Sequence, residues 1–347
     1  MKLFLNGSNM ECKFFAHVAA AALACIAGSA AAQSNVTLYG RVNTTLEIQK
    51  SDGLRRTTVS DNNSRFGFKG SEDLGGGLKA IFQLEGGFDS STGATTRGAL
   101  FGDEAIVGLS GGFGTVKLGQ QALNPVYFTS ADYVSMHNHD TGSSADALFG
   151  LFLEPLQLAR QSNSIAYTSP NFSGLSFQIS QSLAEKTNFT GTNIPRSASS
   201  DVTVDYDNGP LHLGAGYNKN GQNKTYVVRA LYEFGALTLG GYYERDNYEG
   251  AFVGAPVLAN LGTRNNIRLA AMYTVGAGEF HANVGAAGNF SKIAQENKAR
   301  QYTLGYNYNL SKRTKLYGYV TRIDDSAAGL YASGDFSSAA AGIRHNF

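Results

Sequence analysis

Apolar and polar residues alternate one by one along most of this chain. In the stretch from Ser64 to Phe88, Phe66 and Phe68 take one parity while Arg65 and Lys69 take the other, and the alternation resumes after a triple-glycine turn. Because successive side chains of a strand face opposite sides, this spacing predicts a β-hairpin with one apolar face and one polar face. The hairpin alone leaves open whether its apolar face is a core or an outer surface.

Segments with the same alternation recur from Val36 nearly to the last residue. Clear examples are residues 36–47, 175–180, 202–207 and 302–310. We count about sixteen such segments of roughly ten residues each, the pattern typical of a transmembrane antiparallel β-barrel. No linker with a change of composition separates them, so the pattern predicts a single all-β barrel domain.

Tight and long connections between these segments take turns. Turns such as 207–210 and 276–278 alternate with long polar stretches near 51–61, 185–199, 246–264 and 323–334. In outer-membrane barrels the short turns face the periplasm and the long loops face outside. Tyrosine and phenylalanine also gather near the ends of the segments, as they do at a membrane interface.

The chain ends on an alternating segment, with Ile343, His345 and Phe347 on one face. A last strand that reaches the C-terminus can pair with the first strand and remove both sheet edges. A lipid-embedded sheet cannot leave such edges unpaired. The ending therefore favours a closed barrel.

The first 32 residues have the features of a signal peptide. Lys13 precedes an apolar run from Phe14 to Ile26, and Ala30 to Ala32 supply the small residues of a cleavage site. We expect residues 1–32 to be removed and residues 33–347 to form the outer-membrane domain, with Met10 as an alternative start of translation. Both cysteines lie in the removed segment, which excludes disulfide and thiol chemistry in the exported chain.

The charge of the exported chain is balanced. Of 28 basic and 27 acidic side chains, Lys2, Lys13 and Glu11 lie in the removed segment, so 26 of each sign remain. Nucleic-acid binding usually needs a basic excess, so we expect no nucleic-acid partner.

Motifs of catalysis and cofactor binding are weak. The glycine-flanked serine at 108–112 lacks the helix that a nucleophile elbow needs, and His137, His139 and Asp140 are too sparse to predict a metal site. The triple glycine at 75–77 lacks the lysine and hydroxyl of a P-loop. We expect no catalytic residue, no metal and no cofactor.

The chain resembles the general porins of Gram-negative outer membranes over nearly all of residues 33–347. The matching motifs are VTLYG at 36–40, SRFGFKGSEDLGGGLKAIFQLEGGF at 64–88, GDEAIVGLSGGFGTVKLG at 102–119, NSIAYTSPNFSGL at 163–175 and GIRHNF at 342–347. The resemblance implies a sixteen-stranded, water-filled barrel, usually a homotrimer surrounded by outer-membrane lipids, that passes ions and small hydrophilic solutes by diffusion. It also implies that a long third loop folds into the lumen and that the outer-membrane assembly machinery reads Phe347. One departure is Gln120 after Gly119, where family members commonly have arginine.

The longest segment without regular alternation, residues 122–159, carries acidic residues but no lysine or arginine. Such a loop is usually functional or disordered, and by resemblance it is the third loop. Its acids are Asp132, Asp140, Asp146 and Glu154. We expect them to face a basic wall formed by Arg41, Arg65, Lys69, Lys79 and Arg160. The resulting transverse field would align polar solutes; the wall charges favour anions and the loop charges favour cations.

Three alternatives remain open from the residues. A solute-specific channel would need an aromatic slide or a dedicated binding cluster, whereas the inward positions are mostly Thr, Ser, Asn and Gly. An outer-membrane barrel enzyme would need His with Ser or Asp at one rim, whereas the six histidines are scattered. An adhesin would need only long exposed loops and could also be a porin.

Overall fold

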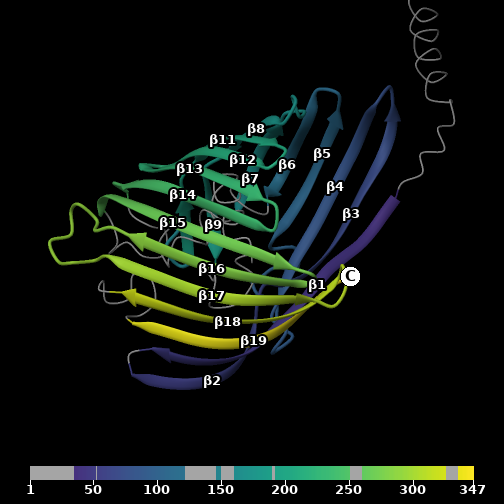
Figure 1. Ribbon diagram of the computed structural model, residues 1–347. Coiled ribbons are helices and arrows are strands. Elements are labelled where there is room, and N and C mark those ends of the chain that lie inside the picture. The colour runs from purple at the N-terminus through teal and green to yellow at the C-terminus, as the bar shows by residue number, and fades with distance from the viewer. Residues whose placement is uncertain are drawn as a thin grey trace, which may run out of the picture.

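In the computed structural model the chain forms one closed, tilted sheet wrapped into a barrel (Figure 1). The structure describes residues 35–51, 53–121, 146–149, 160–189, 192–250, 260–325 and 335–347. The expected signal peptide, residues 1–32, lies outside the described residues. Within these ranges, no helix is long and apolar enough to cross a membrane.

The strands of the barrel wall follow one another in chain order. They are β1 (Asn35–Ser51), β2 (Leu54–Asp61), β3 (Ser64–Gly75), β4 (Leu78–Phe88), β5 (Glu104–Gly111), β6 (Gly114–Gln121), β7 (Gln161–Thr168), β8 (Leu175–Ser182), β11 (Ser199–Asn208), β12 (Leu211–Asn220), β13 (Asn223–Phe234), β14 (Leu237–Tyr248), β15 (Gly262–Val275), β16 (Gly278–Ala287), β17 (Ala299–Asn309), β18 (Thr314–Asp325) and β19 (Phe336–Asn346). Two further strands, β9 (Glu185–Phe189) and β10 (Thr192–Arg196), form a separate two-stranded sheet among the described residues.

The wall has sixteen strand positions, although the sheet has seventeen strands. Both β2 and β3 pair antiparallel with β1, β2 with its second half and β3 with its first half. They are therefore one wall strand interrupted at residues 62–63, where Asn63 has a left-handed backbone with φ 62°. Because β19 pairs with both β18 and β1, the ring closes. The predicted all-β barrel of about sixteen antiparallel strands is confirmed.

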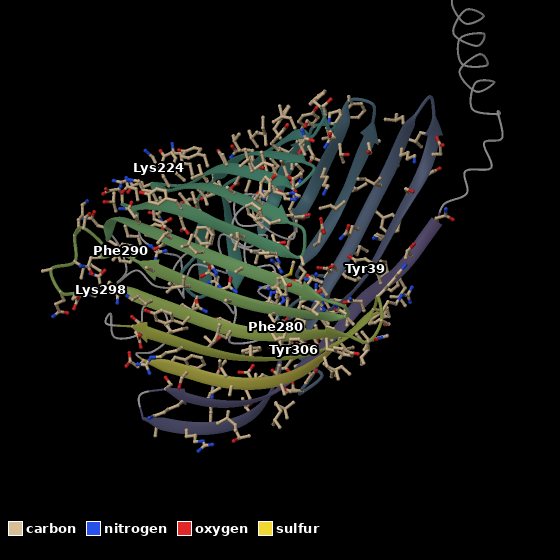
Figure 2. All side chains as sticks on the ribbon, in the orientation of Figure 1. Tyr39, Lys224, Phe280, Phe290, Lys298 and Tyr306 are labelled. Atoms are coloured by element: carbon tan, nitrogen blue, oxygen red, sulfur yellow. The ribbon has the colours of Figure 1, made fainter. Side chains whose placement is uncertain are left out.

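The two faces of the wall have opposite chemistry, as the alternation predicts. On β1, Leu46 is 58% exposed on the outer face, whereas its neighbour Glu47 is 1% exposed on the inner face. Figure 2 shows side chains projecting from both faces of the ribbon. An outer face of leucine, valine and isoleucine is stable only against an apolar medium, which is the arrangement of a barrel in a bilayer. Phe66 and Phe68 lie on this outer face, with their rings edge to face at 6.5 Å.

The two ends of the barrel differ in their connections. Tight turns, including those at 75–77, 209–210 and 276–277, lie at the end that carries the C-terminus, which we call the turn end. Most longer connections lie at the other end, the loop end. In Figure 2, Tyr39, Phe280 and Tyr306 lie toward the turn end, whereas Lys224, Phe290 and Lys298 lie toward the loop end.

Two of the expected long loops are instead partly strands. Residues 54–61, within the loop expected at 51–61, form β2, and Gly53 with φ 81° lets the chain reverse just before it. Residues 185–189 and 192–196, within the loop expected at 185–199, form the paired strands β9 and β10. The alternation failed to predict β2 because this strand is polar on both faces, with Arg55 and Arg56 next to each other.

The seam between the last and first strands is held by tyrosines inside the barrel. Tyr317 and Tyr319 on β18 stack with an interplanar angle of 8° and reach across β19 to β1. The Tyr317 hydroxyl donates to Asn43 Oδ1 at 2.6 Å, and the Tyr319 hydroxyl donates to Glu47 Oε1 at 2.7 Å. A Cβ on Gly342 of β19 would fall 2.5 Å from the Tyr317 ring, so glycine leaves the space that this crossing needs.

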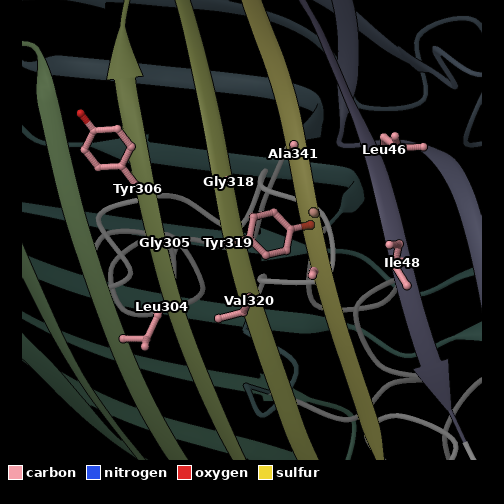
Figure 3. A pocket seen from close by; sticks show the side chains of 11 residues that line it. Leu46, Ile48, Leu304, Gly305, Tyr306, Gly318, Tyr319, Val320 and Ala341 are labelled. Atoms are coloured by element: carbon pink, nitrogen blue, oxygen red, sulfur yellow. The ribbon is translucent and has the colours of Figure 1, made fainter.

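On the outside of the same seam, small residues leave a shallow apolar groove (Figure 3). Its floor includes Gly318 and Ala341, and Leu46 and Ile48 of β1 stand along one side. Leu304 of β17 stands along the other side. The seam is therefore polar and hydrogen-bonded within the lumen and apolar toward the membrane.

Candidate pore constriction

Five charged side chains lie near one another on the inner wall between β1 and β7. Arg41 of β1 is the direct cross-strand partner of Arg65 of β3, and Glu85 of β4 is that of Glu104 of β5. Arg160 immediately precedes β7, and its charge acts on Glu104. We call Arg41, Arg65, Glu85, Glu104 and Arg160 the charge belt.

The middle of the charge belt is tied together by an ion pair and a tyrosine. Arg65 Nε lies 3.6 Å from Glu85 Oε2, and the Tyr39 hydroxyl donates to the same oxygen at 3.0 Å. Gln83 donates to the Tyr39 hydroxyl at 2.8 Å, and the Lys69 ammonium lies 5.0 Å from the centre of the Tyr39 ring. Lys69 lies four residues from Arg65 on β3, which is about 13 Å along the strand. Its contact with the Tyr39 ring nevertheless connects it to the charge belt.

Arg160 is fixed by a clamp at the root of the third loop. Its Nε and Nη2 donate to Asp103 Oδ1 at 3.0 and 2.6 Å, and Arg97 binds the same oxygen. Burial raises the pKa of the Asp103 carboxyl, but the positive charges of Arg160 and Arg97 outweigh this effect and leave the pKa below its ordinary value. One carboxylate shared by two guanidinium groups leaves one positive charge at the edge of the belt.

Lys79 lies far from the other predicted wall residues. Its cross-strand partner is Asp73, eight residues beyond Arg65 on β3, which is about 26 Å along the strand. Lys79 is exposed next to the tight turn at 75–77. The structure therefore brings Arg41, Arg65 and Arg160 together, keeps Lys69 close to them, and leaves Lys79 at the turn end.

Of the four predicted loop acids, Asp146 is the one within the described residues; Asp132, Asp140 and Glu154 lie outside them. Asp146 does not face the charge belt. Its Oδ1 lies 3.0 Å from Arg268 Nη1, both side chains are 1% exposed, and Tyr242 donates its hydroxyl to Asp146 Oδ2. Arg268 is on β15, seven strand positions around the ring from β6, where the third loop begins.

The main chain after Asp146 is also bound to this far wall. The Ala147 amide donates to Gln301 Oε1 at 2.9 Å, and the Leu148 carbonyl accepts from Asn266 at 3.0 Å and from Arg264 at 3.3 Å. All three partners are inward-facing residues of β15 and β17. Part of the third loop therefore lies inside the barrel, as expected from the resemblance.

Two apolar side chains complete the docking. Leu148 is 1% exposed and packs in a cluster with Tyr248, Leu261, Ala287, Phe290 and Ala299. Phe149 packs with Val227, Leu231, Tyr242 and Ala270, its ring edge to face with that of Tyr242 at 5.7 Å. These two clusters hold residues 148 and 149 against the inner wall formed by β13 to β17.

Several of these residues were not singled out from the sequence. Arg264, Arg268 and Tyr242 have the inward parity on their strands, so alternation could have placed them in the lumen. Nothing in the sequence pairs them with the third loop. The sequence did not identify Asp103 as a lumen residue because it lies just before β5. Outside a strand, alternation does not predict which way a side chain faces.

Comparison with known proteins gives a consistent result. A family model described as Gram-negative porin matches residues 19–328. Outer membrane porin protein 32 of Delftia acidovorans is 32% identical, covering 94% of this chain and 98% of that protein. An outer membrane porin protein of Bordetella pertussis is 30% identical, covering 95% of this chain and 99% of that protein.

Solved structures agree with this relationship. The anion-selective porin from Comamonas acidovorans superposes with a TM-score of 0.70 at 27% identity, covering 91% of this chain and all of that one. The closed barrel, the loop segment bound inside it and the end-to-end sequence similarity all indicate the same family. This chain belongs to the Gram-negative porins, and it forms an outer-membrane channel for passive diffusion of small hydrophilic solutes.

Proposed function

We propose that the charge belt is the wall of the pore constriction and that it makes the channel prefer anions. The observation that carries the proposal is the cross-strand pairing of Arg41 with Arg65, which sets two guanidinium groups side by side on the lumen wall. Glu85 and Glu104 neutralise part of this charge, whereas Arg160 and Arg97 share the single carboxylate of Asp103. A lumen surface with a positive excess raises the local concentration of anions.

The similar porin from Comamonas acidovorans is described as anion-selective, which supports the same sign of selectivity here. Asp146 does not weaken the positive side, since its charge is paired with Arg268 on the far wall. We propose that Asp132, Asp140 and Glu154 supply the negative side of the transverse field. Lys69 extends the positive side toward the turn end, and Lys79 acts at the turn-end mouth.

The test is the reversal potential of single channels in a KCl gradient. We expect the wild-type channel to give the sign of an anion-selective pore, and the charge-reversed variants Arg41→Glu and Arg160→Glu to shift it toward cation selectivity. Lys224→Glu, at the loop end of β13, is the matched control with the same change of charge. A reversal potential that does not move in the belt variants would refute the assignment.

We propose further that the channel is a homotrimer embedded in outer-membrane lipids. The aromatic outer face of β3 and β4, where the half-buried rings of Phe66 and Phe88 lie 6.4 Å apart, supports contact with lipid or with another subunit. Openings in steps of three, together with the mass of the purified complex, test the trimer. A monomeric mass with single steps would contradict it.

Two further proposals concern the export and the assembly of the protein. We propose that residues 1–32 are cleaved as a signal peptide and that the assembly machinery reads Phe347. The N-terminal sequence of the mature protein tests the first point. A mature chain that retains residues before Gln33 would contradict it.

A further inference from the structure

We propose that Lys219, Lys224 and Arg245 form a binding site on the outer face of the barrel for the headgroup of a phosphate-bearing lipid in the outer leaflet. We call these three residues the lipid patch. The proposal names a lipid class for the membrane embedding proposed above, on which it rests, and it is independent of the anion preference of the pore. The loop end of an outer-membrane barrel faces the outside of the cell, and Figure 2 labels Lys224 at this end.

Strand parity places all three cations on the outer face. Each has the same parity as a tyrosine two residues farther from the loop end. These tyrosines are Tyr217 on β12, Tyr226 on β13 and Tyr243 on β14. Tyr226 is 48% and Tyr243 is 44% exposed on the outside of the barrel. Because residues two apart on a strand share a face, the lipid patch lies just beyond these outward rings.

The register of the strands brings the three cations together. Lys219 is the direct cross-strand partner of Lys224. Arg245 lies diagonal to Lys224, because its own partner on β13 is Tyr226, two residues along. Cβ atoms directly opposite each other are about 5 Å apart and diagonal ones about 7–8 Å, so one headgroup can contact all three side chains. Like charges directly opposite destabilise a sheet, and an anion bound between them would recover this stability.

The neighbours of the lipid patch leave its charge unbalanced. The flanking cross-strand partners are uncharged: Ser200 for Lys219, Asn247 for Lys224 and Asn265 for Arg245. Arg245 Nη1 donates to Asn265 Oδ1 at 2.9 Å. The acids of β14, Glu244 and Asp246, have the opposite parity and are 0% exposed on the inner face, where both lie near Arg264. The outer face of β12 to β14 therefore carries a positive excess at the loop end.

Another outward cation at the loop end has the opposite surroundings. Arg322 on β18 is exposed, but Asp324 Oδ1 lies 2.6 Å from its Nε and Asp335 Oδ2 lies 3.9 Å from its Nη2. These two carboxylates neutralise the guanidinium group and would repel a lipid phosphate. The uncharged neighbours of the lipid patch, rather than its exposure, are what suit it to an anion.

The surface next to the cations identifies the ligand as a lipid. The Tyr217 and Tyr226 rings lie 4.9 Å apart, and Val228, the next outward residue of β13, is 54% exposed. Tyrosine rings mark the level of the membrane interface, and apolar outward residues lie against acyl chains. Cations just beyond the rings are at the level of the lipid phosphates, which ammonium and guanidinium groups bind by charge-assisted hydrogen bonds. A phosphate on the lipid patch thus places its acyl chains beside Val228.

The experiment uses a fluorescent reporter beside the lipid patch. The chain contains no tryptophan, so Val228→Trp introduces a single one. This protein is reconstituted into phosphatidylcholine vesicles containing a rising fraction of either phosphatidylglycerol or phosphatidylcholine with brominated acyl chains, which quench tryptophan on contact. We expect brominated phosphatidylglycerol to reach half-quenching at the lower fraction. Lys219→Gln and Arg245→Gln should each raise that fraction about fivefold, the effect of one basic residue near a membrane surface.

Arg322→Gln in the same reporter protein is the matched control. It removes an outward cation of the loop end that Asp324 already neutralises, so the half-quenching fraction should not change. Circular dichroism verifies that each variant is folded. EDTA should leave the preference for phosphatidylglycerol unchanged, because the cations contact the phosphate directly. Loss of the preference in EDTA would overturn this direct contact, since a divalent cation would then be required.

The remaining outcomes separate the lipid patch from the membrane embedding. Equal quenching by the two brominated lipids would overturn the lipid patch and retain the contact of β13 with lipid. A preference that persists in the folded double variant of Lys219→Gln and Arg245→Gln would have the same meaning. Quenching by neither lipid would show that a protein surface covers Val228, and it would refute both the lipid patch and the lipid contact of this face.

Discussion

Arg268 and Asp146 form a buried ion pair at 3.0 Å across the lumen, although Arg268 lies on β15 and Asp146 belongs to the loop that starts from β6. The pair fixes the third loop to the wall opposite its origin. Leu148 and Phe149 bury apolar surface beside the pair, which holds the docked segment against the inner wall. The position of the docked segment thus depends on a contact remote from the charge belt.

We expect Arg268→Met to enlarge the pore. The change leaves the Asp146 carboxylate buried without its cation, a loss of about 3–5 kcal/mol that would release the docked segment. Single-channel recordings should show higher and noisier conductance. Arg245→Met is the control, because Arg245 is exposed and bonds to Asn265. Unchanged conductance in a folded Arg268→Met barrel would contradict a role of this pair in pore width.

The clamp at Asp103 predicts a dependence of stability on pH. The folded-state pKa of Asp103 is lowered, so the clamp stabilises the barrel fully above the ordinary aspartate pKa of about 3.9 and loses this contribution as pH falls through the folded-state value. Asp103→Asn should therefore melt earlier than wild type at pH 7, and the difference should shrink below about pH 4. Thermal melts in detergent, followed by circular dichroism, measure this.

An exposed aspartate provides the control for that series. The pKa of Asp89 is also lowered, chiefly by the hydrogen bond from the Ser91 hydroxyl, but this carboxylate is exposed in the connection after β4. Asp89→Asn should change the melting temperature little at any pH. A wild-type advantage over Asp103→Asn that stays constant from pH 7 to about pH 3 would contradict the clamp.

Gly342 should not tolerate a side chain. A Cβ there would fall 2.5 Å from the Tyr317 ring and 2.6 Å from Thr45 Cγ2, so Gly342→Ala should destabilise the barrel by about 1–3 kcal/mol through overpacking. Gly112→Ala is the control, because nothing lies within 4 Å of a Cβ at that turn. Equal unfolding temperatures for the two variants would show that the seam can relax around the added methyl group.

Phe347 has a main-chain role that can be separated from its side chain. Its amide donates to the Gly40 carbonyl at 3.0 Å, and its carbonyl accepts from the Gly40 amide at 3.2 Å. Phe347→Ala keeps both bonds and removes the ring. We expect near-normal folding into detergent in vitro but reduced insertion in cells, measured as the amount of folded protein in outer-membrane fractions.

The two measurements on Phe347→Ala discriminate between explanations. A defect in cells alone points to recognition of the ring during assembly. A defect that also appears in detergent points to packing of the ring over Gly40. Wild-type insertion in cells would contradict the proposed assembly signal.

The sequence by itself determined which way most wall residues face. Phe66 and Phe68 point outward and Arg65 and Lys69 inward, because the period of two is a property of the strand itself and needs no knowledge of its neighbours. The closure of β19 on β1 was predictable for a related reason, since a sheet in lipid cannot leave an edge. The polar strand β2 was missed because it lacks the alternation on which the prediction relied.

The tertiary structure alone decided which charges meet. Asp146 meets Arg268 rather than the basic wall, because docking joins segments seven strand positions apart and no local pattern encodes that distance. Lys79 is separated from Arg65, and Lys219 is placed opposite Lys224, by the register of neighbouring strands. Alternation fixes the face of a residue but not its height on the wall, and an electrostatic site depends on both.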